Sequence, residues 1–166
     1  MNILKESRRL SSVCDLYVRV CSIAAFIAPL LLRVALALPF IRSGLTRWNG
    51  FLSLSEGQSF LFEAQFKLHI LGSQYRLPFP DATAYLVGLL EILLPALLFL
   101  GLATRFAAAG LLAMTCVIQL VAPDGWANFH LYWAAISTTL IALGPGVLSL
   151  DALIAHRIKY RNDATI

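Results

Sequence analysis

Three charged side chains stand inside long apolar runs of this chain and are its first candidates for chemistry. Arg33 and Arg42 lie in a run over residues 22–45, and Glu91 lies in a second run over residues 82–102. A charge in such a run is costly in lipid, so it usually faces the interior of a bundle and pairs. An arginine and a glutamate in contact form a charge-assisted, bidentate interaction.

The depth of these groups along their helices decides which of them can meet. At about 1.5 Å of rise per residue, Arg42 lies about 6 Å, Glu91 about 14 Å and Arg33 about 20 Å from the outer end. Glu91 therefore lies between the two arginines. The sequence predicts an intramembrane ion pair of Arg33 with Glu91, with Arg42 as the alternative partner. Such a pair either fixes helix register or belongs to a proton-linked or ligand-binding site.

A second group of polar and aromatic residues gathers in the outer half of the chain. Gln119 ends the third apolar run and His130 begins the fourth, so their depths match within about one turn. An apolar slot with aromatic walls and a few polar groups is typical of a small-molecule site. The candidate quinone site comprises Arg42, Glu91, Gln119, His130, Trp126 and Trp133. His130 is its best proton carrier, and the alternative is an interfacial aromatic belt without a ligand.

No metal site and no intrinsic cofactor are predicted. His69 and His156 have no ligand-type residues nearby, and Cys14, Cys21 and Cys116 lack metal-ligand spacing. The sequence also contains no phosphate-binding glycine loop and no serine nucleophile elbow. The candidate site is therefore expected to bind an organic molecule.

The composition indicates which elements position these groups. Of the 166 residues, 59% are apolar and only 13% are charged, whereas about a quarter of the residues in soluble domains are charged. This balance excludes a disordered chain and exceeds what a small soluble domain can bury. We therefore predict an all-α fold, a four-helix integral membrane bundle in one domain over residues 1–166. The expected spans are residues 22–45, 82–102, 104–122 and 128–143.

The remaining segments predict the topology. Residues 1–19 indicate either an amphipathic helix at the membrane surface or an extension of the first span. The polar connection over residues 46–81 is expected to be a structured outer loop, with a short helix over residues 57–71. Eight basic residues on the side of the termini against four on the other side predict a multi-pass inner-membrane protein with cytoplasmic ends. Topology thus explains the net charge of +4 without nucleic-acid binding.

Four segments resemble, in order, the DoxX family of small four-span membrane proteins. They are an arginine-containing first helix closing on Ser-Gly-Leu-Thr-Arg, a glycine-to-glutamate stretch, a tight turn and a Gly-Pro-Gly C-terminal signature, at residues 32–47, 84–91, 101–108 and 144–151. The chain departs from the family pattern at Pro95 and in its long 46–81 connection. The resemblance covers nearly the whole chain from about residue 30.

The resemblance implies a four-helix membrane bundle and a redox setting, because the family name comes from a membrane subunit of a thiosulfate:quinone oxidoreductase. It favours a membrane subunit of a quinone-linked oxidoreductase, acting in sulfur-compound oxidation or redox stress. The chain has no visible redox centre, so a partner protein, or a substrate that reacts directly with quinone, would supply electrons. The alternative is a non-catalytic membrane anchor or assembly scaffold. A small transporter, formed by a homo-oligomer, is a third hypothesis.

Overall fold

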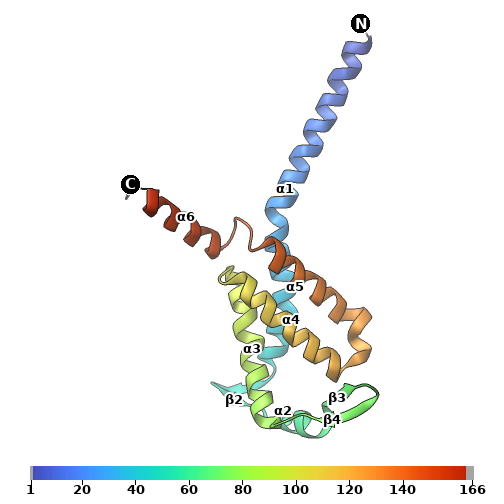
Figure 1. Ribbon diagram of the computed structural model, residues 1–166, viewed down its shortest axis with the longest axis vertical. Helices are drawn as coiled ribbons and strands as arrows, with labels where there is room; N and C mark the ends of the chain where they lie inside the picture. The colour runs from blue at the N-terminus through green and yellow to red at the C-terminus, as the bar shows by residue number, and fades with distance from the viewer. Residues whose placement is uncertain (1, 164–166) are drawn as a thin grey trace.

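The computed structural model describes residues 2–163, with side chains from residue 13 to residue 161. It is mostly helical (Figure 1). The long helices are α1 (Asn2–Leu45), α3 (Pro80–Leu100), α4 (Thr104–Val121), α5 (Leu131–Leu143) and α6 (Leu150–Asp163). By length and composition, α1 from Val13 onward, α3 and α4 can each cross a membrane. The fourth expected span corresponds to the π-helical turn η3 (Trp126–His130) and α5, which alone has 13 residues.

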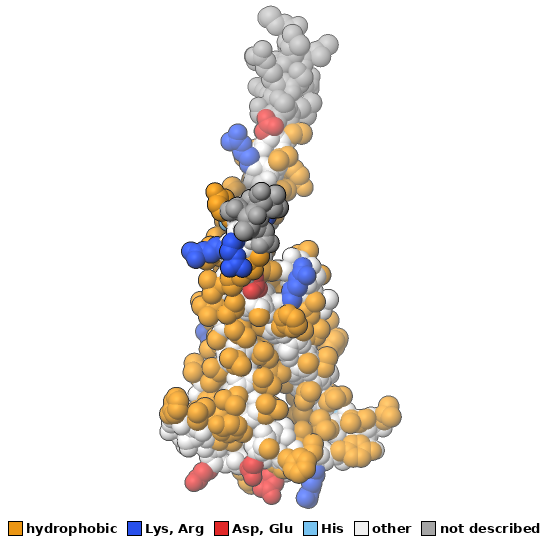
Figure 2. Space-filling view, turned by 60° about the vertical axis from the view of Figure 1, so that its left-hand side comes forward, with side chains coloured by type: hydrophobic (Ala, Val, Ile, Leu, Met, Phe, Trp, Pro, Cys, Tyr) orange, Lys and Arg blue, Asp and Glu red, His pale blue; other side chains and the backbone are white. Residues whose placement is uncertain are grey.

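The central apolar core lies between α1, α3, α4 and α5. Leu36 and Phe40 of α1 are buried against Leu98, Leu111 and Leu140 of the other three helices. The outer surface of the same helices is also apolar, and Figure 2 shows hydrophobic side chains covering the flanks between charged ends. A body that is apolar inside and outside is expected of helices surrounded by lipid.

Small residues let the helices approach closely. A Cβ atom added to Gly44 of α1 would lie 3.0 Å from the carbonyl oxygen of Glu91 in α3, and one on Gly110 of α4 would lie 2.8 Å from a methyl carbon of Leu94. Such glycines are characteristic of helix contacts in membranes. The Gly44 contact places the end of α1 beside the middle of α3.

Residues 46–79 form the outer segment, which folds against one end of the bundle (Figure 1). Its elements are β1 (Trp48–Gly50), β2 (Ser53–Leu54), α2 (Glu56–Phe60), the π-helix η1 (Leu61–Gln65), β3 (Lys67–Ile70) and β4 (Ser73–Arg76). The expected all-α fold is therefore corrected by two small antiparallel sheets. The expected short helix is right only as far as Gln65, because Phe66 is extended and Lys67–Ile70 form β3; Leu71 and Gly72 then adopt positive φ. That turn closes the β3–β4 hairpin.

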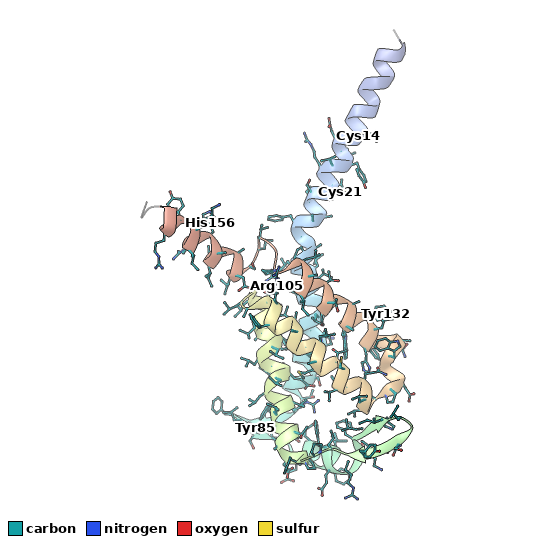
Figure 3. The ribbon with its side chains drawn as sticks, in the orientation of Figure 1. Cys14, Cys21, Tyr85, Arg105, Tyr132 and His156 are labelled. Carbon is teal, nitrogen blue, oxygen red and sulfur yellow. The ribbon has the colours of Figure 1, made fainter. Side chains whose placement is uncertain are left out.

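Both ends of the described chain leave the bundle at the end opposite the outer segment (Figure 1). Residues 2–19 are continuous with the first span in α1, which agrees with the extension alternative. The part of α1 before Pro29 projects beyond the bundle and carries Cys14 and Cys21 (Figure 3). The C-terminal residues, expected only as a basic tail, form α6.

Replacement of Gly101, the left-handed C-cap of α3, tests this packing. A Cβ atom on Gly101 would lie 2.9 Å from the backbone Cα of Ser149 and would also meet the end of the Arg33 side chain, at a φ of +68°. Left-handed backbone costs about 1–2 kcal/mol in a non-glycine residue, and the clash adds to that. We expect Gly101→Ala to lower the unfolding midpoint in detergent clearly. Gly50→Ala is the control, because nothing lies within 4 Å of its added Cβ, and equal midpoints would contradict the packing.

Candidate functional site

A buried ion pair joins the end of α1 to the middle of α3. Nε and Nη2 of Arg47 donate to Oε2 and Oε1 of Glu91 over 2.5 and 2.8 Å. The Glu91 side chain is 3% exposed and that of Arg47 is 12% exposed. Arg47 also donates through Nη1 to Oε1 of Gln58 at 2.7 Å, and its guanidinium lies 5.4 Å from the centre of the Phe62 ring. The pair therefore also holds α2 and η1 of the outer segment.

The predicted pairing of Glu91 with Arg33, or with Arg42, is wrong. The depth estimate placed the end of the first span at the outer surface, whereas α1 ends beside Glu91, eleven residues after the start of α3. The turn after Leu45 brings Arg47 over the carboxylate. Arg42 is exposed, and Nη2 of Arg33 donates to the carbonyl oxygen of Leu148 at the other end of the bundle.

A cavity of about 230 Å³ lies beside the ion pair. Its walls come from α1, α3, α4, α5 and the outer segment, and are mostly apolar. The lining residues are Pro39, Phe40, Ser43, Arg47, Phe62, Phe66, Leu77, Thr83, Val87, Glu91, Val117, Ile118, Val121, Ala122 and Trp133. Five of these residues have a polar side-chain group: the hydroxyls of Ser43 and Thr83, the guanidinium of Arg47, the carboxylate of Glu91 and the indole N–H of Trp133. The arrangement suits a flat apolar molecule with a polar edge.

The structure divides the six predicted site residues into three groups. Glu91 and Trp133 line the cavity, whereas Arg42 and Trp126 are exposed and lie outside its lining. Gln119 and His130 form a separate pair, described next. The six residues therefore do not form one site, and binding of quinone by any of them stays a prediction.

Gln119 and His130 contact each other, as their matching depths indicated. Nδ1 of His130 lies 2.6 Å from Oε1 of Gln119, so a neutral His130 donates from Nδ1. Nε2 of Gln119 donates to the carbonyl oxygen of Pro123 at 3.1 Å. The His130 ring centre lies 5.4 Å from that of Trp133, which places the pair behind one wall of the cavity.

Sequence reasoning missed Arg47, Gln58 and Phe62. A signal existed for Arg47, because it closes the segment that resembles the family's first helix and follows Ser43 by four residues. Its Nη2 lies 3.5 Å from Oγ of Ser43. No local pattern indicated Gln58 or Phe62, since their place depends on how the outer segment folds back over the bundle.

A second polar cluster fixes the opposite end of the bundle. Asp151 accepts hydrogen bonds from the backbone N–H groups of Ala103 and Thr104 at 2.8 and 2.9 Å, and so caps α4. Its own N–H donates to the carbonyl oxygen of Gly101 at 2.9 Å. Burial alone would raise the pKa of the Asp151 carboxyl, but the bonds from Thr104 and Ala103 and the nearby charge of Arg33 outweigh it and lower that pKa.

These features define a class, a helical membrane protein with three helices able to span and a buried ion pair beside an apolar cavity. The DoxX family model matches residues 28–124, and the chain belongs to the DoxX family. A Haemophilus influenzae protein, described as an uncharacterized protein, is 30% identical over 153 residues, covering 80% of this chain and 86% of that protein. No solved structure matches. The family match includes both Arg47 and Glu91.

Breaking the ion pair tests its place in the fold. Removing one partner of a buried pair leaves the other charge uncompensated, at a cost of about 3–5 kcal/mol. We expect Glu91→Gln and Arg47→Gln each to lower the unfolding midpoint in detergent. The unfolding midpoint of the double variant should fall by clearly less than the sum of the two single decreases, because neither charge remains buried without its partner. Additive losses would contradict direct contact.

The pH dependence of stability under acid conditions tests whether Asp151 caps α4. A carboxyl whose pKa is lowered on folding stabilises the fold above its unfolded pKa of about 3.9. This contribution is lost as the pH falls through the folded pKa. We expect the natural chain to be more stable than Asp151→Asn at pH 7, with a difference that shrinks below about pH 4. Unfolding midpoints over this range measure it, and a constant difference would argue against the cap.

Proposed function

We propose that this protein is a multi-pass inner-membrane subunit of a quinone-linked oxidoreductase. In this proposal α1, α3, α4 and the η3–α5 segment form a four-helix membrane bundle, and both termini are cytoplasmic. The observation that carries the proposal is the apolar cavity whose charged lining residues are Arg47 and Glu91. Membership of a family often associated with oxidoreductase systems supports it.

The cavity fits the head of a quinone. Its volume of about 230 Å³ is below the ~300–1,000 Å³ of pockets that enclose drug-sized ligands, so it suits one ring while a prenyl tail remains in lipid. Phe40, Phe62 and Trp133 offer aromatic walls. Arg47 has five N–H donors, of which three bond to Glu91 and Gln58 and a fourth makes the longer contact with Ser43, which leaves one on Nη1. It therefore keeps donor capacity for a ring oxygen.

The reaction would add two electrons and two protons to a bound quinone and release quinol. The electrons would come from a redox cofactor in a partner subunit, or from a substrate that reacts directly with the quinone. In this chain, Arg47 would stabilise negative charge developing on the ring oxygen. Glu91 would exchange a proton within the cavity, and His130, behind the Trp133 wall, is a second proton carrier.

A membrane anchor or scaffold is the second candidate, and the projecting part of α1 favours it. Leu16, Tyr17 and Ile23 are 63%, 70% and 60% exposed there, beyond the end of the bundle. A partner protein bound to this helix would cover them. This function predicts a co-purifying partner and an activity that does not change when Glu91 is replaced.

Quinone content distinguishes the two candidates. The protein is purified in mild detergent, extracted with organic solvent, and its quinone is measured per chain. We expect near-stoichiometric quinone in the natural chain and a large loss in Arg47→Gln and Glu91→Gln, which remove polar partners, and in Val87→Phe, which fills the cavity. Arg42→Gln is the matched control, since Arg42 is exposed outside the cavity lining.

Unfolding midpoints show which of these variants remain folded, and Val87→Phe keeps the ion pair intact. Trace quinone in every sample, the natural chain included, would refute the quinone site. Equal quinone in the natural chain and a folded Val87→Phe would place the quinone elsewhere.

A further inference from the structure

The two hairpins of the outer segment end in large apolar side chains that the described chain leaves wholly or partly exposed. At the β1–β2 turn, Phe51 is 97% exposed and Leu52 is 49% exposed. At the β3–β4 turn, Ile70 is 40% and Leu71 is 102% exposed. Hairpin turns in water normally carry polar residues or glycine, so these four side chains need an explanation.

The backbone at both tips makes their leucines more unusual. Leu52 has a φ of 56° and Leu71 a φ of 49°, a left-handed region that only glycine, asparagine and aspartate enter readily. Leu71 and Gly72 stand where a two-residue turn of this kind favours Asn-Gly. The sequence thus places leucine at both tips, although these backbone positions favour glycine or asparagine and although leucine is unfavourable in water. Strained residues of this sort concentrate at functional sites.

The position of the tips indicates what covers them. In Figure 1 the β1–β2 and β3–β4 hairpins extend to opposite sides of the bundle, at the end where the outer segment lies. In Figure 2 hydrophobic side chains continue down the flanks to this end, whereas charged side chains gather at its lowermost face. The apolar tips therefore extend the apolar surface of the bundle outward on two sides. A soluble partner docked on the terminal face would instead meet the charged side chains.

We propose that the two hairpin tips insert into the headgroup–acyl boundary of the adjoining lipid leaflet, one on each side of the bundle. Lipid covers Phe51 and Leu52 at one tip and Ile70 and Leu71 at the other. The outer segment, which supplies Phe62 to the cavity wall, is thereby anchored to the membrane as well as to the bundle. The inference rests on insertion of the bundle into a bilayer and does not depend on the cavity's ligand.

Depth-dependent fluorescence quenching tests the insertion. The three native cysteines are first replaced (Cys14→Ser, Cys21→Ser and Cys116→Ala). The full chain then receives a fluorophore at Leu71→Cys, in vesicles that contain lipids with a nitroxide either near the headgroup or midway along the acyl chain. We expect strong quenching by the lipid and weak quenching by aqueous iodide. Leu93→Cys, on the outer face of α3 and 56% exposed, marks the bilayer, and the exposed, charged position Glu63→Cys marks water.

Iodide quenching without lipid quenching at Leu71→Cys, beside lipid quenching at Leu93→Cys, would overturn the proposal while leaving membrane insertion intact. Loss of lipid quenching at Leu93→Cys as well would overturn insertion itself, and this inference with it. Neither result depends on bound quinone, so failure here is distinct from failure of the quinone site.

A second variant separates the lipid contact from a role in folding. Leu71→Asn creates the preferred Asn-Gly turn and removes the apolar tip. With the fluorophore at Ile70→Cys, we expect this change to reduce lipid quenching and increase iodide quenching. The unfolding midpoint should stay equal or rise, because the turn is relaxed. Unchanged lipid quenching would contradict the proposal, and so would a lower midpoint, since it would show that the leucine serves the fold.

Discussion

The contact between Arg47 and Glu91 is the ion pair that ties together three parts of the molecule: α1, α3 and the outer segment. It joins the end of α1 to the middle of α3, and through Gln58 and Phe62 it holds the outer segment. Two charges taken out of water need good geometry and additional hydrogen bonds to offset their desolvation. The bidentate contact and the bond to Gln58 meet this requirement. The pair therefore helps to hold the outer segment over the cavity, together with the apolar packing of Phe62 and Leu77 against Ala84.

The other end of the bundle is closed in a different way. Asp151 caps α4, and its backbone N–H donates to the carbonyl oxygen of Gly101 in the turn after α3. At the same end, Arg33 donates to the carbonyl oxygen of Leu148. These contacts join the C-terminal segment to the turn, and a Cβ atom on Gly101 would clash with the arginine. Where the outer end has a cavity beside Arg47, this end has a polar cluster formed by Arg33, Asp151 and backbone groups. Polar contacts thus join helices at both ends, and the end beside Arg47 also has room for a ligand.

The sequence alone placed α3 and α4 within about two residues, because each is a long, mostly apolar run and residues 101–108 resemble the family's tight turn between them. The same reasoning missed the strands of the outer segment, which are two to four residues long and carry no long alternation. It also missed α6, because the many charged residues of this helix leave no clear apolar periodicity. The resembling segments identified the family, which the match over residues 28–124 confirms.

The partner of Glu91 could not be found by counting depth along straight spans. That count assumes that neighbouring helices end at one plane, and the close contact of Gly44 with the Glu91 backbone shows that α1 stops earlier. The cavity was likewise beyond sequence reasoning, since Phe62 and Leu77 reach it only through the fold of the outer segment. Local patterns predict helices well, whereas these contacts depend on tertiary packing.

Photo-crosslinking shows whether the cavity beside the Arg47–Glu91 pair binds a ligand. A photoreactive quinone analogue is bound to the protein in vesicles, illuminated, and its adducts are mapped by mass spectrometry with and without excess quinone. We expect adducts on cavity residues such as Thr83, Val87 and Trp133, and we expect excess quinone to reduce them. Adducts confined to outward-facing residues such as Leu86 and Leu93, and not reduced by competing quinone, would contradict binding in the cavity.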